Sequence, residues 1–203
     1  MAISTYAELK TEIADHLDRD DLTTKIDTFI DLAEARHRRD IRIREMITRE
    51  AITIDARYEN FPTGLLEVIT FRLLTDPVTK LSYVTPEQMG DYRKEESGKP
   101  ELFTIHSQFE FNKVPDASYS GEILFHKALT ALSDSNTTNV LLTRAPDAYL
   151  YAALVASAPY LLNDERIETW ASLYKSAVDG LAIARRQERS SGVLVSRVRG
   201  STP

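Results

Sequence analysis

The chain of 203 residues contains no cysteine. This absence excludes a disulfide framework, a cysteine-ligated zinc or iron–sulfur site, and a thiol nucleophile. Stability therefore has to come from a packed core or from assembly with other chains. The hydrophobic fraction of 42% is typical of globular domains and is sufficient for a sizeable core.

Motifs of catalytic chemistry are missing as well. The seven glycines are scattered singly, so the sequence has no glycine-rich phosphate loop, no GxSxG elbow and no HRD-type catalytic loop. No two histidines have the HExxH or His-x-His spacing of metal ligands. The four histidines are His16, His37, His106 and His126. We therefore expect no enzyme activity, no metal site and no cofactor.

Long apolar runs are also absent. The longest uncharged stretch with a helical pattern, residues 148–163, includes Pro159 and is shorter than the roughly 20 apolar residues that cross a bilayer. Residues 1–8 have neither a basic start nor an apolar run, so we expect no secretory signal peptide. These features predict a cytosolic protein without membrane contact.

Charge is distributed unevenly along the chain. The net charge is −6, but the C-terminal end is basic. Its arginines, against the single Glu188, are Arg185, Arg186, Arg189, Arg197 and Arg199. Because affinity for a phosphate backbone depends on lysine and arginine, the acidic remainder argues against general nucleic-acid binding. The basic end and the arginine-rich stretch 36–44 remain as candidates.

Two helices are predicted near the N-terminus. Thr5-Tyr-Ala-Glu8 has the form of a capping box and is followed by apolar residues at helical spacing, which predicts a helix over 6–17. A second apolar stripe begins at Leu22 and predicts a helix that continues to about Met46. Acid–base pairs at i,i+4 would support the charged second half of this helix.

The middle of the chain has the pattern of strands. From about Thr48 the apolar period changes from 3.6 to 2, and this pattern continues to about residue 128. The aromatic alternation around His106-Ser-Gln108 is typical of a hairpin with an inward aromatic face. Thr85-Pro-Glu-Gln88 combines an N-cap, proline at the first helical position and glutamine at the third, and predicts a short helix near 86–93.

The remaining patterns complete the predicted fold. Turn-forming residues at 130–140 predict a linker, and two further helices follow, of which the last ends near Arg189. We predict an α+β fold in which N- and C-terminal helices form a helical bundle with an inserted small antiparallel β domain and an extended C-terminal tail. The predicted domains are the bundle, 1–47 plus 141–189; the β domain, 48–129; the linker, 130–140; and the tail, 190–203.

The arginine-rich stretch has two interpretations. Arg36-His-Arg-Arg39, with Arg42 and Arg44, has the composition of a nucleic-acid face. Successive helical residues point about 100° apart, however, so these arginines spread around the helix. Acidic partners also lie nearby in the sequence, which favours a solvated or subunit-contacting surface.

The tail has an unusual composition. Val193, Leu194, Val195 and Val198 lie among Arg197 and Arg199, which is more apolar than a typical disordered segment and too short for a core. This composition favours docking, in which an extended segment is added to a partner's strand edge or laid in a groove and the arginines meet acidic groups. The alternative is a frayed terminus.

Several stretches together carry a family resemblance. They are Tyr6-Ala-Glu-Leu-Lys10 with 13–22; 29–36 with Arg42-Ile-Arg-Glu-Met46; Gly98-Lys-Pro100, 103–105 and 115–119; and 131–139 with 142–151, Asp164-Glu-Arg166 and Trp170. Over nearly its whole length, the chain resembles the head-to-tail adaptor (connector) proteins of tailed bacteriophages.

The resemblance implies a non-enzymatic virion protein of the neck, present in the host cytoplasm during assembly. It also implies a ring of twelve copies that binds the portal protein and a tail or nozzle protein. DNA would pass through the continued channel without sequence-specific binding. In such adaptors the C-terminal segment grips the portal, and by position and composition we assign this docking role to Val193, Leu194, Val195, Arg197, Val198 and Arg199.

A ring with head-to-tail contacts needs two different, complementary faces on each subunit. Helices with edges of mixed charge provide such faces. We therefore predict that Glu34, Arg36, Arg38 and Arg42 lie near subunit contacts. Two alternatives stay open: another neck component, such as a stopper or tail-completion protein, and a DNA-packaging accessory that binds nucleic acid through 36–44.

Overall fold

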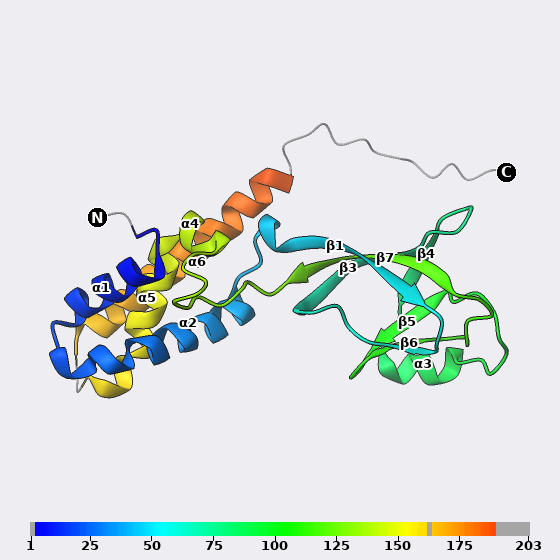
Figure 1. Cartoon of the computed structure of the whole chain (residues 1–203), viewed down its shortest axis with the longest axis horizontal. Helices are drawn as coiled ribbons and strands as arrows, with labels where there is room; N and C mark the ends of the chain where they lie inside the picture. Colours follow the sequence, from blue (N-terminus) through cyan, green and yellow to red (C-terminus); the bar gives the residue numbers. More distant parts are fainter. Residues whose placement is uncertain (1–2, 162–163, 190–203) are drawn as a thin grey trace. The chain divides into compact units, whose positions relative to one another are not determined.

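The computed structural model describes residues 3–161 and 164–189 (Figure 1). The chain divides into two compact units. Of the described residues, the helical unit comprises 3–44, 130–161 and 164–189, and the β unit comprises 45–129. The predicted tail, 190–203, lies outside the described residues.

Helices form the first unit, together with two 3-10 turns. The α-helices are α1 (Tyr6–Leu17), α2 (Ile26–Asp40), α4 (Val140–Arg144), α5 (Pro146–Ala156) and α6 (Arg166–Arg189), and the 3-10 turns are Asp20–Lys25 and Ala158–Tyr160. The capping box predicted for α1 is confirmed: the Thr5 side chain accepts from the Glu8 amide, and the Glu8 carboxylate accepts from the Thr5 amide. These bonds pair helix-terminal amides that would otherwise have no partner.

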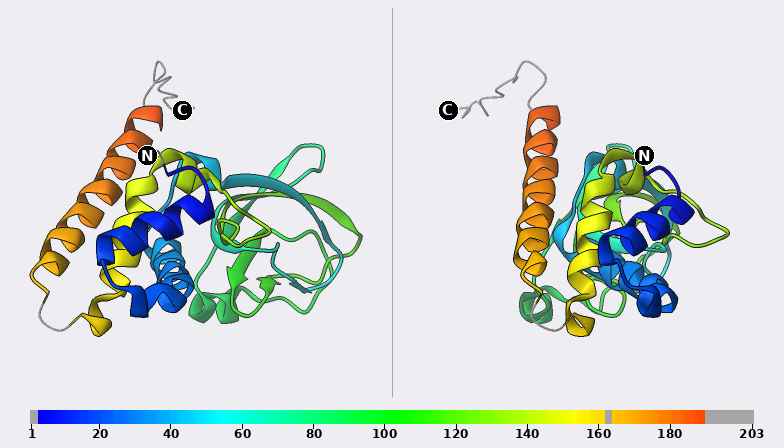
Figure 2. Two further views of the ribbon diagram at one scale, coloured as in Figure 1. Left: turned by 60° about the vertical axis from the view of Figure 1, so that its left-hand side comes forward. Right: turned by 90° about the vertical axis from the view of Figure 1, so that its left-hand side faces the viewer.

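The helical unit is organised around α5. Side chains are buried on all faces of this helix: Ala148, Tyr149, Leu150, Ala152, Ala153 and Leu154. The helices α1, α2 and α6 each pack against α5, and Figure 2 shows α5 between α6 on one side and α1 and α2 on the other. The predicted bundle of N- and C-terminal helices was wrong. A bundle needs one apolar stripe from each helix, whereas here one apolar helix is covered by the others.

The second predicted helix also ends earlier than expected. It does not continue to Met46, because α2 ends at Asp40 and Ile41 is extended. Ile41 and Ile43 are both buried, with the half-buried Arg42 between them. Burial of alternate residues in an extended segment therefore overrides the helical charge pairing predicted beyond Asp40. A 3-10 turn, Arg44–Met46, then leads into the first strand.

The β unit contains a seven-stranded sheet. Its strands are β1 (Ile47–Ile54), β2 (Tyr58–Glu59), β3 (Leu65–Leu73), β4 (Thr79–Tyr83), β5 (Leu102–Ile105), β6 (Phe109–Phe111) and β7 (Tyr119–Lys127). Their order is β1-β7-β3-β4-β5-β6-β2. The aromatic residues of the predicted hairpin point inward, since Phe103, Phe109 and Phe111 join the buried core of this unit.

The sheet is mixed, so the prediction of a small antiparallel β domain was wrong. Strands β4 and β5 pair in parallel through Ser82 with Leu102 and Tyr83 with Phe103. Parallel neighbours need a long crossover connection, usually with a helix. Residues 84–101 provide it, and they contain α3 (Pro86–Tyr92) with the capping box predicted at Thr85 and Gln88. The short helix predicted from the sequence therefore lies in the crossover connection that the parallel pair of strands requires.

Candidate subunit-contact surface

The four predicted contact residues lie on the second half of α2 and just after it, but their surroundings differ. Glu34 is buried with 8% of its surface exposed, and Arg38 is exposed. Arg36 and Arg42 are half-buried. The structure therefore places these side chains along one segment without giving them one common face, as expected for residues spaced about 100° apart on a helix.

Glu34 belongs to a buried polar network. Its Oε1 accepts a hydrogen bond from the Leu132 amide at 2.7 Å and another from the Tyr149 hydroxyl at 3.3 Å. Burial raises the pKa of the Glu34 carboxyl, because the charged form loses its hydration. Glu34 thus holds the segment before α4 against α2 and α5.

The same network continues through Asn139. Its amide nitrogen donates to the Tyr149 hydroxyl at 2.6 Å and to the Thr130 carbonyl at 3.0 Å, while its Oδ1 accepts from the Leu142 amide and caps α4. The Thr137 carbonyl accepts from the Tyr6 amide at 2.7 Å. Residues 130–139, which make up most of the predicted linker 130–140, are therefore hydrogen-bonded to α1, α2 and α5.

His37 is a buried residue whose role the sequence analysis did not assign. It is 2% exposed, its Nε2 lies 3.3 Å from the Ala148 carbonyl, and its ring packs edge-on against Tyr149. Burial lowers the pKa of His37 to about 4, so the ring is neutral at pH 7 and Nε2 donates to the carbonyl. The signal was available, because His37 continues the apolar stripe of Ile26, Ile30 and Ala33 at helical spacing.

Arg36 joins α2 to α6. Its guanidinium lies 4.2 Å from the centre of the Tyr174 ring, and its Nε lies 3.4 Å from the Asp40 carboxylate. The Tyr174 hydroxyl donates to the same Asp40 carboxylate at 3.0 Å. Burial, together with the nearby Asp40, raises the pKa of Tyr174. Arg36 and Asp40 are therefore engaged within the helical unit.

Arg42 stabilises the end of α2. Its Nη1 donates to the carbonyl oxygens of Arg38 at 2.7 Å and Ile41 at 2.8 Å. Carbonyls in the last turn of a helix have no intrahelical partner, and a cation there also interacts favourably with the helix dipole. Arg42 therefore has a structural role here, whereas the side chain of exposed Arg38 projects from the surface.

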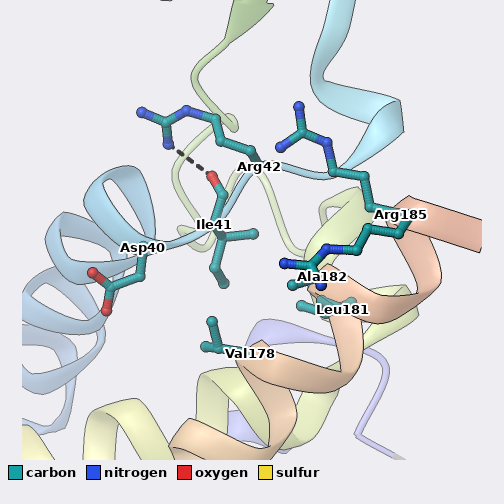
Figure 3. Close-up of a pocket in the computed structure, with 8 residues that line it drawn as sticks. Asp40, Ile41, Arg42, Val178, Leu181, Ala182 and Arg185 are labelled. Atoms are coloured by element: carbon teal, nitrogen blue, oxygen red, sulfur yellow. Dashed lines mark hydrogen bonds between the residues drawn. The ribbon is translucent and has the colours of Figure 1, made fainter. Parts of the chain in front are cut away.

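A groove lies where the end of α2 meets α6. The hollow has a volume of about 320 Å³ and is lined by Asp40, Ile41, Arg42, Val178, Leu181, Ala182, Arg185 and Arg186. We call this hollow the α2–α6 groove. Figure 3 shows the apolar side chains of Ile41 and Val178 pointing toward each other, with Arg42 and Arg185 above them. The groove thus combines an apolar floor with a cationic rim.

Neither a metal-binding cluster nor a membrane-spanning helix is found in the described part of the chain. Within residues 3–161 and 164–189, no group of histidine, aspartate and glutamate side chains is arranged to hold a metal ion. The same ranges contain no helix with the length and apolar character needed to span a bilayer. The predicted docking residues Val193, Leu194, Val195, Arg197, Val198 and Arg199 lie outside these ranges.

Comparison with known proteins gives the family. The model of the SU10 adaptor protein family matches residues 4–198, which cover both units. The chain belongs to the SU10 adaptor protein family. The resemblance found in the sequence is thereby confirmed: this is a phage adaptor protein, with a structural role in the virion neck. Among curated proteins, none matches the chain.

The residues of this adaptor that carried the resemblance include its buried network. Leu132 and Asn139 lie in the stretch 131–139, Tyr149 lies in 142–151, and Glu34 lies in 29–36. These segments are far apart in the sequence and are hydrogen-bonded together in the helical unit. The stretches that resemble adaptor proteins thus include residues whose hydrogen bonds hold the helices of this unit together.

Proposed function

We propose that this adaptor assembles as a ring of twelve copies that joins the portal protein to the tail and continues the DNA channel. The match to the SU10 adaptor family over residues 4–198 carries the proposal. The role is structural and non-enzymatic, with no cofactor. The partners are the portal on one side and a tail or nozzle protein on the other, and Val193–Arg199 is the segment that grips the portal.

The net negative charge of the chain is better suited to letting DNA pass through the channel than to binding it. Each lysine or arginine contact with a phosphate slows a moving duplex, and the net charge of the chain is −6. Within the arginine-rich stretch, Arg36 is engaged by Asp40 and Tyr174, and Arg42 by helix carbonyls. These contacts favour the adaptor over a packaging accessory that binds DNA through 36–44.

The experiment that tests this function is electron microscopy of the purified protein mixed with its cognate portal, beside a copy truncated after Arg189. We expect the full-length protein to add a ring to the portal and the truncated copy to lose portal binding. Binding of the full-length protein to tail components without any binding to the portal would favour the stopper or tail-completion alternative.

A control keeps the tail's length and charge while removing its apolar side chains. The quadruple variant Val193→Ser, Leu194→Ser, Val195→Ser and Val198→Ser retains both Arg197 and Arg199. If the apolar residues anchor the tail, this variant should bind the portal as poorly as the truncated copy. Portal binding that survives in both variants would contradict the assignment of the tail as the grip.

A further inference from the structure

The α2–α6 groove has the chemistry of a docking site for an acidic, aliphatic surface. Its floor is formed by Ile41, Val178, Leu181 and Ala182, and its rim by Arg42, Arg185 and Arg186. The floor favours an aliphatic side chain, because burying apolar area is favourable. The rim favours a carboxylate placed beside that side chain.

The one acid that lines the groove does not cancel this charge. Asp40 accepts from the Tyr174 hydroxyl at 3.0 Å and lies 3.4 Å from the Arg36 Nε. In Figure 3 its carboxylate lies on the far side of Ile41 from Arg185. Arg186, an exposed residue of the groove lining, therefore presents positive charge to whatever enters the groove.

The same helical unit carries a surface of the complementary kind. On the first half of α2, Asp31 and Leu32 are neighbours and both are exposed. Leu32 is 51% exposed, although the apolar stripe of this helix is formed by other residues. The Asp31 side chain has no hydrogen bond or ion pair with any described residue. The pair thus offers an aliphatic side chain with a carboxylate beside it.

We propose that the α2–α6 groove of one copy receives the Asp31–Leu32 surface of a second copy. Leu32 would pack on Val178 and Ala182, and the Asp31 carboxylate would meet Arg186. The contact is heterologous, because the α2–α6 groove and the Asp31–Leu32 surface are different parts of one subunit. Heterologous contacts generate rings when the rotation from one copy to the next closes. This inference rests on the proposed ring and names the surfaces that form it.

Cysteine cross-linking tests the contact without background, since the chain has no cysteine. The variants Leu32→Cys and Ala182→Cys are mixed in equal amounts with the cognate portal and treated with a short bis-maleimide. We expect a cross-linked dimer in the mixture and none with either variant alone. Ser172→Cys, an exposed position on α6 outside the groove lining, replaces Ala182→Cys as the matched control and should give no dimer.

A charge exchange provides the second measurement. Arg186→Glu should lower the yield of this dimer about tenfold, since like charges facing each other across an interface are costly. Asp31→Arg should do the same, and combining both changes should restore the yield. The control is Lys94→Glu, which makes the same charge change at an exposed residue of the β unit and should leave the yield unchanged.

The outcomes separate this contact from the ring itself. Rings on the portal without a Leu32–Ala182 cross-link would overturn the contact and leave the proposed function intact. Absence of rings with the unaltered protein would overturn the proposed function. Two other outcomes would show that the contact is wrong, provided that the copies still cross-link. If Arg186→Glu abolishes portal binding, the groove binds the portal; if it abolishes a salt-sensitive gel shift with duplex DNA, the groove binds DNA.

Discussion

The hydroxyl of Tyr149 on α5 donates to the carboxylate of Glu34 on α2, across 3.3 Å of the buried interior of the helical unit. Glu34 was selected from the sequence as a charged surface residue at a subunit contact. In the folded chain its carboxylate instead binds groups within its own unit. The bond therefore gives Glu34 a part in holding the helical unit together, whereas Arg38 is the exposed member of that predicted set and Arg36 and Arg42 are half-buried.

Removing the Tyr149 hydroxyl should destabilise the helical unit. Tyr149→Phe keeps the ring but deletes the donor to Glu34 and the acceptor of the Asn139 amide. We expect the free energy of unfolding to fall by about 1–2 kcal/mol, because buried polar groups are left with fewer partners. Urea denaturation followed by circular dichroism measures this loss. Tyr119→Phe, which removes an exposed hydroxyl bonded to Asp116, should cost less than about 0.5 kcal/mol.

His37 should make stability depend on pH. Burial lowers its pKa from 6.5 to about 4, so the unfolded chain binds the proton more readily in this range. Stability should therefore be lost as the pH falls from 6.5 towards 4, by about 3 kcal/mol in total. Urea denaturation at several pH values measures the slope of the free energy of unfolding against pH.

Two comparisons isolate the contribution of His37. His37→Phe retains the ring packing and should flatten the slope between pH 6.5 and 4. Glu34, with its raised pKa, acts in the opposite direction, since its contribution to stability falls as the pH rises through that pKa. It is present in both proteins, so the difference between them reports His37. His16→Gln serves as the control, and a slope that survives in His37→Phe would contradict the assignment.

Charge reversal should have different effects on stability and ring assembly at Arg38 and at Arg36. Arg38→Glu changes an exposed side chain, so we expect a free energy of unfolding within about 0.5 kcal/mol of that of the unaltered protein. Ring assembly should nevertheless be weaker. Arg36→Glu removes the contact with Tyr174 and repels Asp40, and should cost about 1 kcal/mol. Denaturation combined with imaging of portal complexes distinguishes the two. Unchanged ring assembly with Arg38→Glu would remove Arg38 from the subunit contact.

The β unit should depend strongly on Phe71. Its ring is 1% exposed and lies against Phe103 at 5.3 Å, Phe109 at 5.2 Å and Phe111 at 5.8 Å. Phe71→Ala leaves a cavity and should cost about 3–5 kcal/mol. Phe71→Leu retains more of the volume and should cost less. Resistance of the β unit to proteolysis, measured alongside denaturation, checks this order.

Local signals allowed several elements to be predicted from the sequence. The capping boxes at Thr5 and Thr85 locate the starts of α1 and α3, because the pattern and the hydrogen bonds involve residues only three apart. The inward aromatic face of β5 and β6 follows from a period of 2. Family resemblance, spread over nearly the whole chain, identified the adaptor where single motifs carried no chemistry.

The tertiary structure decided what depends on residues far apart in the chain. The sequence by itself determined the helix starts, the strand periodicity, the absence of thiol chemistry and the family. The end of α2 at Asp40, the parallel pairing of β4 with β5 and the buried position of Glu34 depended on the folded chain. Periodicity is local, whereas burial of Glu34 requires Leu132 and Tyr149, which lie about a hundred residues away and come near only when α5 packs against α2.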